Sequence, residues 1–215
     1  MIRFLRGFRA RKNADSIYKK TIITAIMSSA PELDTHTLSI ALANYYRSAR
    51  GMKTALAVSG GDRGFADMLR DSECVSIDPP GYDDGIMRYY LIRDLSDIER
   101  IAAAVPERLV LDLGCIRGDI STKELLICDR ICALISTSPW RCLDTREFFA
   151  ATIVKETGLR QRFRNRAYSV AGREEDDLAI GREFGISIRR IRGRELICDP
   201  YRLTRDDLER LNVFN

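Results

Sequence analysis

The chain has 215 residues, 45% of them hydrophobic and 31% charged, and a formal net charge of +4. This composition predicts one soluble globular domain with a sizeable core. The absence of any run of about 18 uninterrupted apolar residues argues against a membrane-spanning helix. The N-terminal MIRFLRGFRARK lacks an apolar core and a cleavage site, so we expect a cytoplasmic protein and no secretory signal.

Residues 1–16 are predicted to be a basic N-terminal arm that precedes an α/β domain over residues 17–215. Apolar side chains of the arm fall near one helical face, and they are Ile2, Phe4, Leu5 and Phe8. Two interpretations stay open for this arm, namely peripheral contact with a membrane surface and docking onto its own domain.

The rest of the chain alternates between strand and helix patterns. Predicted strands cover Thr21–Met27, Lys53–Val58, Cys74–Ile77, Ile86–Leu91, Arg108–Leu113, Arg130–Ser136, Tyr168–Val170 and Ser187–Ile191. Predicted helices cover Thr35–Arg50, Phe65–Leu69, Asp94–Val105, Leu143–Thr157, Glu174–Phe184 and Thr204–Val213, with Gly81–Gly85 an acidic loop. This alternation predicts a mostly parallel sheet with helices on both faces, in one domain.

Six cysteines are scattered along the chain, and the only histidine is His36. Cys128 and Cys132 are the closest pair, but their spacing is a weak metal signal and a mixed Cys/His zinc site is not expected. We expect no metal site and interpret the cysteines as buried free thiols in a reducing cytoplasm.

The stretch Leu33–Tyr46, the strand Lys53–Val58 and the stretch Leu109–Gly114 together resemble the ParA/MinD group of deviant Walker-A ATPases. Within that group the chain is most similar to diverged CpaE/TadZ-like members associated with tight-adherence pili. Leu33–Tyr46 corresponds to the end of the phosphate loop and its helix, and Asp112 to the Walker-B aspartate. The resemblance implies a P-loop NTPase-like fold, a face-to-face homodimer and a bacterial localisation role with protein partners.

The loop that should hold phosphate departs from the family pattern. Its substituted positions are Ala30 at the signature lysine, Pro31, Glu32 and Asp34 at glycines, Thr35 at the second lysine, and His36 at the magnesium hydroxyl, followed by Thr37. A phosphate loop needs glycine backbone N–H groups and a lysine. Proline removes a donor, and the acids repel a polyanion. We therefore expect neither ATP nor magnesium as cofactor, and no catalytic residue.

Asp34 is predicted to cap the helix that follows it, in preference to an anion site at that helix end. Asp112 is predicted to bond the loop backbone, Thr35 or His36 in a structural role. His36 is interpreted as a capping or surface residue, with a catalytic base as the alternative. Trp140 is expected to be half-buried, with an exposed interface anchor as the alternative.

Arginine clusters occur at Arg3–Lys12, Arg160–Arg166 and Arg189–Arg194. The last offers a basic surface patch of Arg189, Arg190, Arg192 and Arg194. Pairing with the acidic run Glu174–Asp177 is the first interpretation, and non-specific DNA binding is the alternative.

The sequence supports three functional hypotheses. The first is a non-hydrolysing pseudo-ATPase that acts as a scaffold or localisation factor, recruited to a cell pole, the inner membrane face, a pilus or a secretion assembly. The second is a partition-type protein that binds DNA through its arginines. The third is a residual NTPase that obtains its lysine from a partner.

Overall fold

The computed structural model describes residues 21–59, 65, 67, 69, 75–77, 81–104, 107–115, 122–154, 157–163, 166–191 and 199–214. The predicted arm 1–16 and the residues Asp62, Cys74, Arg192, Arg194 and Cys198 lie outside these ranges. Within them, no helix is both long and apolar enough to cross a lipid bilayer.

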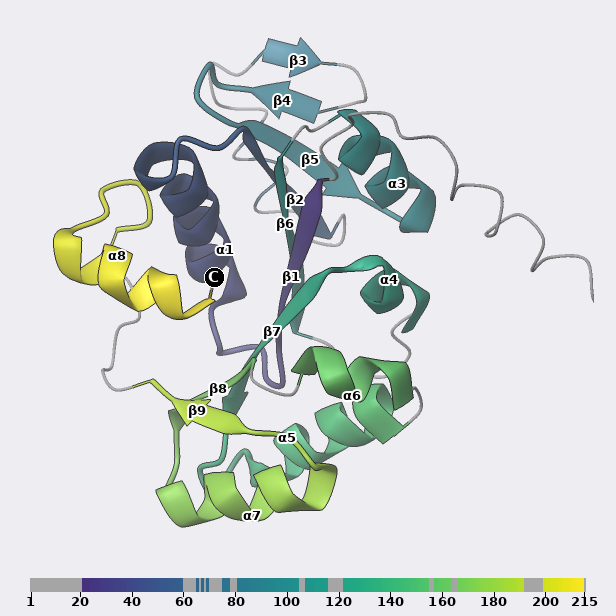
Figure 1. Ribbon diagram of the computed structural model, residues 1–215, viewed down its shortest axis with the longest axis vertical. Helices are drawn as coiled ribbons and strands as arrows, with labels where there is room; N and C mark the ends of the chain where they lie inside the picture. Colours follow the sequence, from purple (N-terminus) through teal and green to yellow (C-terminus); the bar gives the residue numbers. More distant parts are fainter. Residues whose placement is uncertain are drawn as a thin grey trace, which may run out of the picture.

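A nine-stranded sheet forms the centre of the fold (Figure 1). Its strands are β1 (Ile22–Ser28), β2 (Thr54–Ser59), β3 (Val75–Ile77), β4 (Gly81–Asp83), β5 (Arg88–Ile92), β6 (Arg108–Cys115), β7 (Arg130–Ser136), β8 (Ala167–Ala171) and β9 (Ile188–Arg190). The order across the sheet is β3-β4-β5-β2-β6-β1-β7-β8-β9. The seven strands β5, β2, β6, β1, β7, β8 and β9 pair in parallel with their neighbours. The remaining two, β3 and β4, extend the sheet beyond β5 and pair antiparallel.

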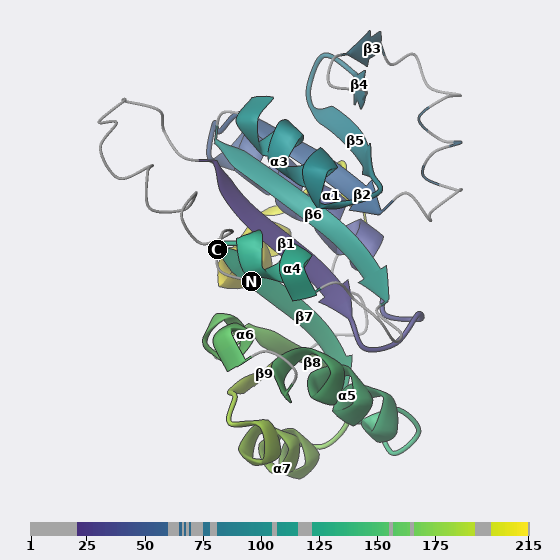
Figure 2. The same ribbon diagram turned by 90° about the vertical axis from the view of Figure 1, so that its right-hand side faces the viewer.

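Helical segments cover both faces of the sheet. They are α1 (Thr35–Asn44), η1 (Tyr45–Ala49), α3 (Leu95–Ala104), α4 (Thr122–Ile127), α5 (Cys142–Phe149), η2 (Ala150–Val154), α6 (Thr157–Phe163), α7 (Glu174–Phe184), α8 (Arg205–Leu211) and η3 (Asn212–Phe214). Figure 1 shows α1 and α8 on one side of the sheet, and α3, α4 and α6 on the other. Figure 2 views the second side directly, with α3 and α4 in front of the central strands. The predicted fold class, mostly parallel with helices on both faces, is confirmed.

Alternation along the central strand β1 divides the core in two. Ile23, Ala25 and Met27 join the cluster that packs against α3 to α7, whereas Ile26 joins the cluster under α1, η1 and α8. Successive side chains of a strand point to opposite faces, so a strand buried on both faces is apolar at nearly every position. This geometry explains why β1 and β6 have almost continuous apolar sequences.

Several element boundaries differ from the predictions. Residues 81–83, predicted as part of a loop, form the short strand β4, because they pair with β3 on one side and with β5 on the other. The helices α4 and α6 were not predicted. The predicted helices Thr35–Arg50 and Leu143–Thr157 each change to a π-helical turn before they end. Such turns insert one extra residue per turn and rotate the residues that follow them.

Two of the four cysteines in the described ranges are fully enclosed, and we expect their thiols to resist alkylation in the native state. Cys128 and Cys132 are 0% exposed, and burial raises the pKa of the Cys132 thiol to about 11. Cys115 and Cys142 are half-buried. Because the thiolate is the reactive form, iodoacetamide in mildly alkaline buffer should label Cys115 and Cys142 before Cys128 and Cys132.

Peptide mapping by mass spectrometry before and after denaturation tests this difference site by site. Labelling of Cys132 as fast as that of Cys142 in the folded protein would contradict the packing of β7.

Candidate functional site

A cavity of about 410 Å³ opens at the carboxyl ends of β1, β2 and β6. Its lining comes from the loop after β1 and the start of α1, from the end of β2, and from the end of β6; these residues are Pro31, Glu32, Leu33, Asp34, Thr35, His36, Val58, Ser59, Asp112, Leu113, Gly114 and Cys115. The carboxyl ends of parallel strands are where open α/β sheets bind ligands. The structure therefore brings the predicted loop and the Walker-B-like Asp112 to one site.

The loop after β1 is closed by its own hydrogen bonds. The backbone N–H of Leu33 donates to the carbonyl of Ala30 at 3.1 Å, and Ser28 Oγ donates to the same carbonyl at 3.0 Å. Asp34 caps α1, since its Oδ1 accepts from the backbone N–H of Thr37 at 2.9 Å. The predicted cap is confirmed, and it uses one of the N–H groups that an anion would need.

His36 and Asp112 meet across the cavity. His36 Nδ1 is hydrogen-bonded to Asp112 Oδ2, and the other carboxylate oxygen accepts from the backbone N–H of Gly114 at 3.0 Å. Asp112 is buried, with 1% of its side chain exposed, whereas 39% of His36 is exposed. The ring of His36 also stacks on Phe65 at 6.5 Å between centroids.

This geometry confirms the structural contact predicted between Asp112 and His36, and the backbone partner of Asp112 is Gly114 of β6. It corrects the interpretation of His36 as a cap or simple surface residue, because its ring bridges α1 to β6. The carboxylate fixes the orientation of the ring, and the pair ties the start of α1 to the end of the central strand β6.

The charge of the cavity is negative. Glu32, Asp34 and Asp112 contribute carboxylates, and the described lining contains no lysine or arginine. Just outside it, Arg141 forms an ion pair with Glu32 and another with Asp144 at 3.0 Å. The hydrogen bond to Asp144, followed by attraction to Glu32, raises the pKa of Arg141. No described group of three or more His, Cys, Asp or Glu side chains is arranged to hold a metal ion.

Contacts from the turn after β7 complete the site, and sequence reasoning missed them. Arg141 reaches Glu32 from that turn, and Ser29 Oγ lies 3.0 Å from the Thr145 hydroxyl, which donates to the Ser136 carbonyl at 2.7 Å. Arg141 and Glu32, and likewise Ser29 and Thr145, lie more than a hundred residues apart along the chain. No local pattern could have indicated them.

Trp140 lies in the same turn and is 89% exposed. The expectation that it would be half-buried is therefore wrong, because the turn carries its side chain outward, beyond the reach of the core. Leu143, three residues further on, is 66% exposed. Both exposed side chains follow the carboxyl end of β7, at the same edge of the sheet as the cavity, and we refer to them as the Trp140–Leu143 pair.

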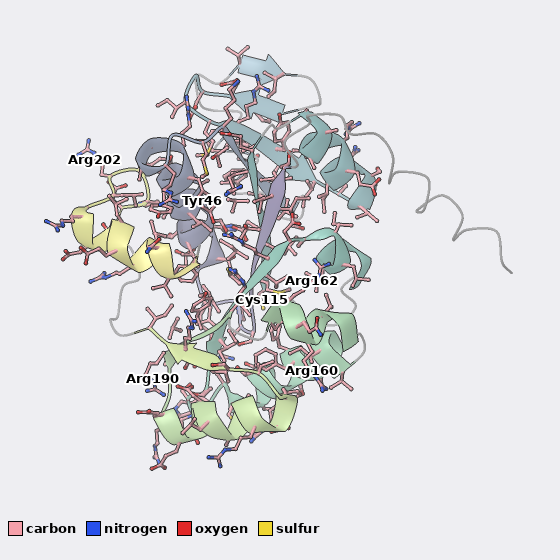
Figure 3. All side chains as sticks on the ribbon, in the orientation of Figure 1. Tyr46, Cys115, Arg160, Arg162, Arg190 and Arg202 are labelled. Carbon is pink, nitrogen blue, oxygen red and sulfur yellow. The ribbon has the colours of Figure 1, made fainter. Side chains whose placement is uncertain are left out.

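The two described arginines of the Arg189–Arg194 cluster, Arg189 and Arg190, differ in their contacts. Arg190 binds Asp177 Oδ2 through Nε at 3.0 Å and through Nη2 at 2.5 Å, and it donates to the Gly172 carbonyl at 2.6 Å. Figure 3 shows Arg190 beside α7, whereas Arg202 extends outward from the segment before α8. The predicted pairing with the acidic run is confirmed for Asp177, and Arg189 is exposed.

The sheet order, the helices on both faces and the cavity at the strand ends give a fold similar to that of solved MinD and ParA structures. The structure is similar to an Aquifex aeolicus MinC:MinD cell division complex, with 12% identity, a TM-score of 0.53, and coverage of 78% of this chain and 79% of that chain.

A ParA family ATPase from Chlorobium tepidum matches with 12% identity, a TM-score of 0.50, and coverage of 81% and 85%. A Borrelia burgdorferi protein assigned to plasmid partition and bound to AMPPNP matches with 14% identity, a TM-score of 0.55, and coverage of 91% and 97%. No protein-family model and no curated protein matches the sequence.

Proposed function

We propose that this protein is a non-hydrolysing pseudo-ATPase with a MinD/ParA-like fold, which acts as a scaffold or localisation factor through protein contacts. The observation that carries this proposal is the charge of the cavity: three carboxylates line it, with no lysine or arginine in the described lining. A triphosphate is a polyanion, and one like-charge contact at about 4 Å costs about 4 kcal/mol at a protein-surface dielectric. The degenerate loop therefore disfavours ATP.

The backbone of the loop supports the same proposal. Phosphate loops bind oxygens with several free backbone N–H groups. Here Pro31 has no N–H, while those of Leu33 and Thr37 are bonded to Ala30 and Asp34. Binding ATP would require these internal bonds to break without a lysine to compensate.

The exposed Trp140–Leu143 pair supports a role in protein binding. Exposed tryptophan is enriched among the residues that anchor protein interfaces. The pair lies at the same edge as the cavity, which suits a partner or a second copy that covers both. We propose a cytoplasmic factor of the CpaE/TadZ-like type that serves a bacterial pilus or secretion assembly. Peripheral contact of the N-terminal arm with the inner membrane face is part of this proposal.

The alternative of DNA binding through Arg189, Arg190, Arg192 and Arg194 has less support. Arg189 and Arg190 are both exposed, but Arg190 is paired with Asp177, which reduces the charge that the described part of the cluster offers to DNA. Retention on heparin or duplex DNA across a salt gradient tests this alternative. A phosphate-release assay, with and without a Thr35→Lys substitution, tests the residual NTPase.

We expect isothermal titration of ATP with magnesium to give no binding tighter than about 1 mM, because acids and internal hydrogen bonds occupy the loop. Titration of the same nucleotide into a MinD or ParA protein serves as the positive control. Micromolar binding to this chain would overturn the pseudo-ATPase proposal.

A further inference from the structure

We infer that the opposite edge of the sheet carries a second site, which binds a phosphoryl anion. A hollow of about 370 Å³ lies where η1 ends, β2 and β5 begin and α3 ends. Its charged lining residues are Arg47, Lys53, Arg88 and Asp83. We refer to this feature as the basic hollow, and the inference does not depend on the function proposed for the carboxyl-end cavity.

The basic hollow has a fixed wall in the β4–β5 turn. Asp84 Oδ1 accepts from the backbone N–H groups of Ile86 and Met87, at 2.8 and 2.7 Å, and its Oδ2 accepts from the Tyr89 hydroxyl at 2.9 Å. Arg47 Nε donates to the Ile86 carbonyl at 2.9 Å. The turn is therefore held in one shape, and it holds the guanidinium of Arg47 by one edge.

The positive charge of the hollow is only partly compensated. Arg88 is paired with Asp83 at 3.1 Å, and this hydrogen bond raises the pKa of Arg88. The terminal nitrogens of Arg47 and the ammonium of Lys53 have no ion-pair partner among the described residues. Three cations thus face one carboxylate.

Glu107 is a nearby acid outside the lining, and its carboxylate holds the backbone beside the hollow. Glu107 Oε2 accepts from the backbone N–H of Lys53 at 2.8 Å, so it anchors the start of β2. Thr54 Oγ1 donates to the Met52 carbonyl at 3.0 Å, which closes the same turn. The lysine is therefore presented from a fixed backbone.

The geometry points to a compact phosphoryl group as the ligand. A guanidinium offers two parallel N–H donors to phosphate oxygens, and an ammonium adds a point charge. A volume of about 370 Å³ accommodates a diphosphate or a small phosphate ester. Ser59, which lines the other cavity, is five positions after Thr54 in β2, roughly 17 Å along the strand, so the two sites are distinct.

Titration calorimetry of the full chain with pyrophosphate tests this inference. We expect binding that weakens with added salt and about tenfold in Lys53→Gln, because that variant removes one of the two uncompensated cations. Arg50→Gln removes an exposed arginine that is close in sequence but outside the lining, and it should leave binding unchanged.

Vesicle flotation distinguishes the source of the phosphoryl group. Phosphatidylcholine vesicles with and without phosphatidic acid supply it as a lipid headgroup, and pyrophosphate supplies it in solution. Lys53-dependent binding in either arm supports the site and identifies its source. Absence of binding in both arms, or equal binding by Lys53→Gln and Arg50→Gln, would overturn the inference.

Discussion

We expect the Gly172→Ala variant to lose about 4 kcal/mol of its free energy of unfolding. Gly172 follows β8 with φ of 127°, a conformation that costs an L-residue about 1 to 3 kcal/mol. A Cβ there would lie 2.0 Å from Thr137 Oγ1, 2.6 Å from the Thr137 carbonyl carbon and 2.9 Å from the Ser138 nitrogen. Two of these atoms belong to the backbone, so the overlap adds about 1 to 3 kcal/mol.

The clash falls where several elements meet. The backbone N–H of Thr137 donates to the Ala171 carbonyl at 2.8 Å, and its hydroxyl donates to Asp177 Oδ1 at 2.7 Å. Any shift of Thr137 therefore pulls on β8 and α7 together. The loss should appear as a lower urea midpoint by circular dichroism.

Gly51→Ala is the matched control for this prediction. Gly51 also has a positive φ, 64°, but a Cβ there would meet no atom within 4 Å. Its substitution should cost only about 1 to 2 kcal/mol, the strain of the left-handed backbone alone. Equal losses in the two variants would show that backbone strain, and no steric overlap, limits Gly172.

The elements that sequence patterns located well are those whose signals are local. The strand Arg130–Ser136 agrees at both ends, because an apolar run is bounded there by charge and by turn residues. Helix α7 agrees as well, since acids occupy its first turn and Gly185 ends it with φ of 66°. The Asp34 cap could also be predicted, because its partner Thr37 is only three residues away in the sequence.

The elements that were missed depend on contacts with distant residues. Strand β4 contains Gly81, Tyr82 and Asp83, a poor strand sequence, and exists because it pairs with β5. Trp140 is exposed and Arg141 pairs with Glu32 because of the way the turn after β7 packs against the loop after β1. Such outcomes follow from tertiary packing, which no local window contains.

The same distinction holds at the candidate site. The apolar pattern of Arg108–Leu113 placed Asp112 near the carboxyl end of a buried strand, and parallel strand ends share one edge. It could not decide which residue would bind this aspartate, because that depends on the register of α1 over β6. The structure selects His36.

We expect Asp112→Ala to destabilise the protein by about 3 kcal/mol. The carboxylate is buried, and it accepts hydrogen bonds from His36 Nδ1 and from the backbone N–H of Gly114. Removing a buried charged acceptor costs about 1.5 to 3 kcal/mol per bond, since its donors are left unsatisfied. Chemical denaturation measures the change.

Asp144→Ala is the control for loss of a carboxylate that is only half-buried. Asp144 pairs with Arg141 at 3.0 Å, and 34% of its side chain is exposed. Such surface pairs contribute about 0 to 1 kcal/mol, so this variant should stay close to the unsubstituted protein. The contrast separates a buried structural carboxylate from carboxylate loss in general.

The stability of Asp112→Ala also distinguishes between two roles for this carboxylate. A carboxylate kept to order a magnesium ion is held near other acids at a cost to stability, so its removal is often neutral or stabilising. A carboxylate kept to join α1 to β6 should destabilise when it is removed. An Asp112→Ala protein as stable as the unsubstituted chain would therefore argue for a retained nucleotide function and against the pseudo-ATPase proposal.

A double-mutant cycle with His36→Ala completes this test. Each single variant leaves one buried or half-buried partner without its hydrogen bond, whereas the double variant removes both groups. Residues in direct contact show coupling energies of about 0.5 to 3 kcal/mol. The double variant should therefore lose less stability than the two single losses added together, and simple additivity would mean that the His36–Asp112 contact does not hold α1 against β6.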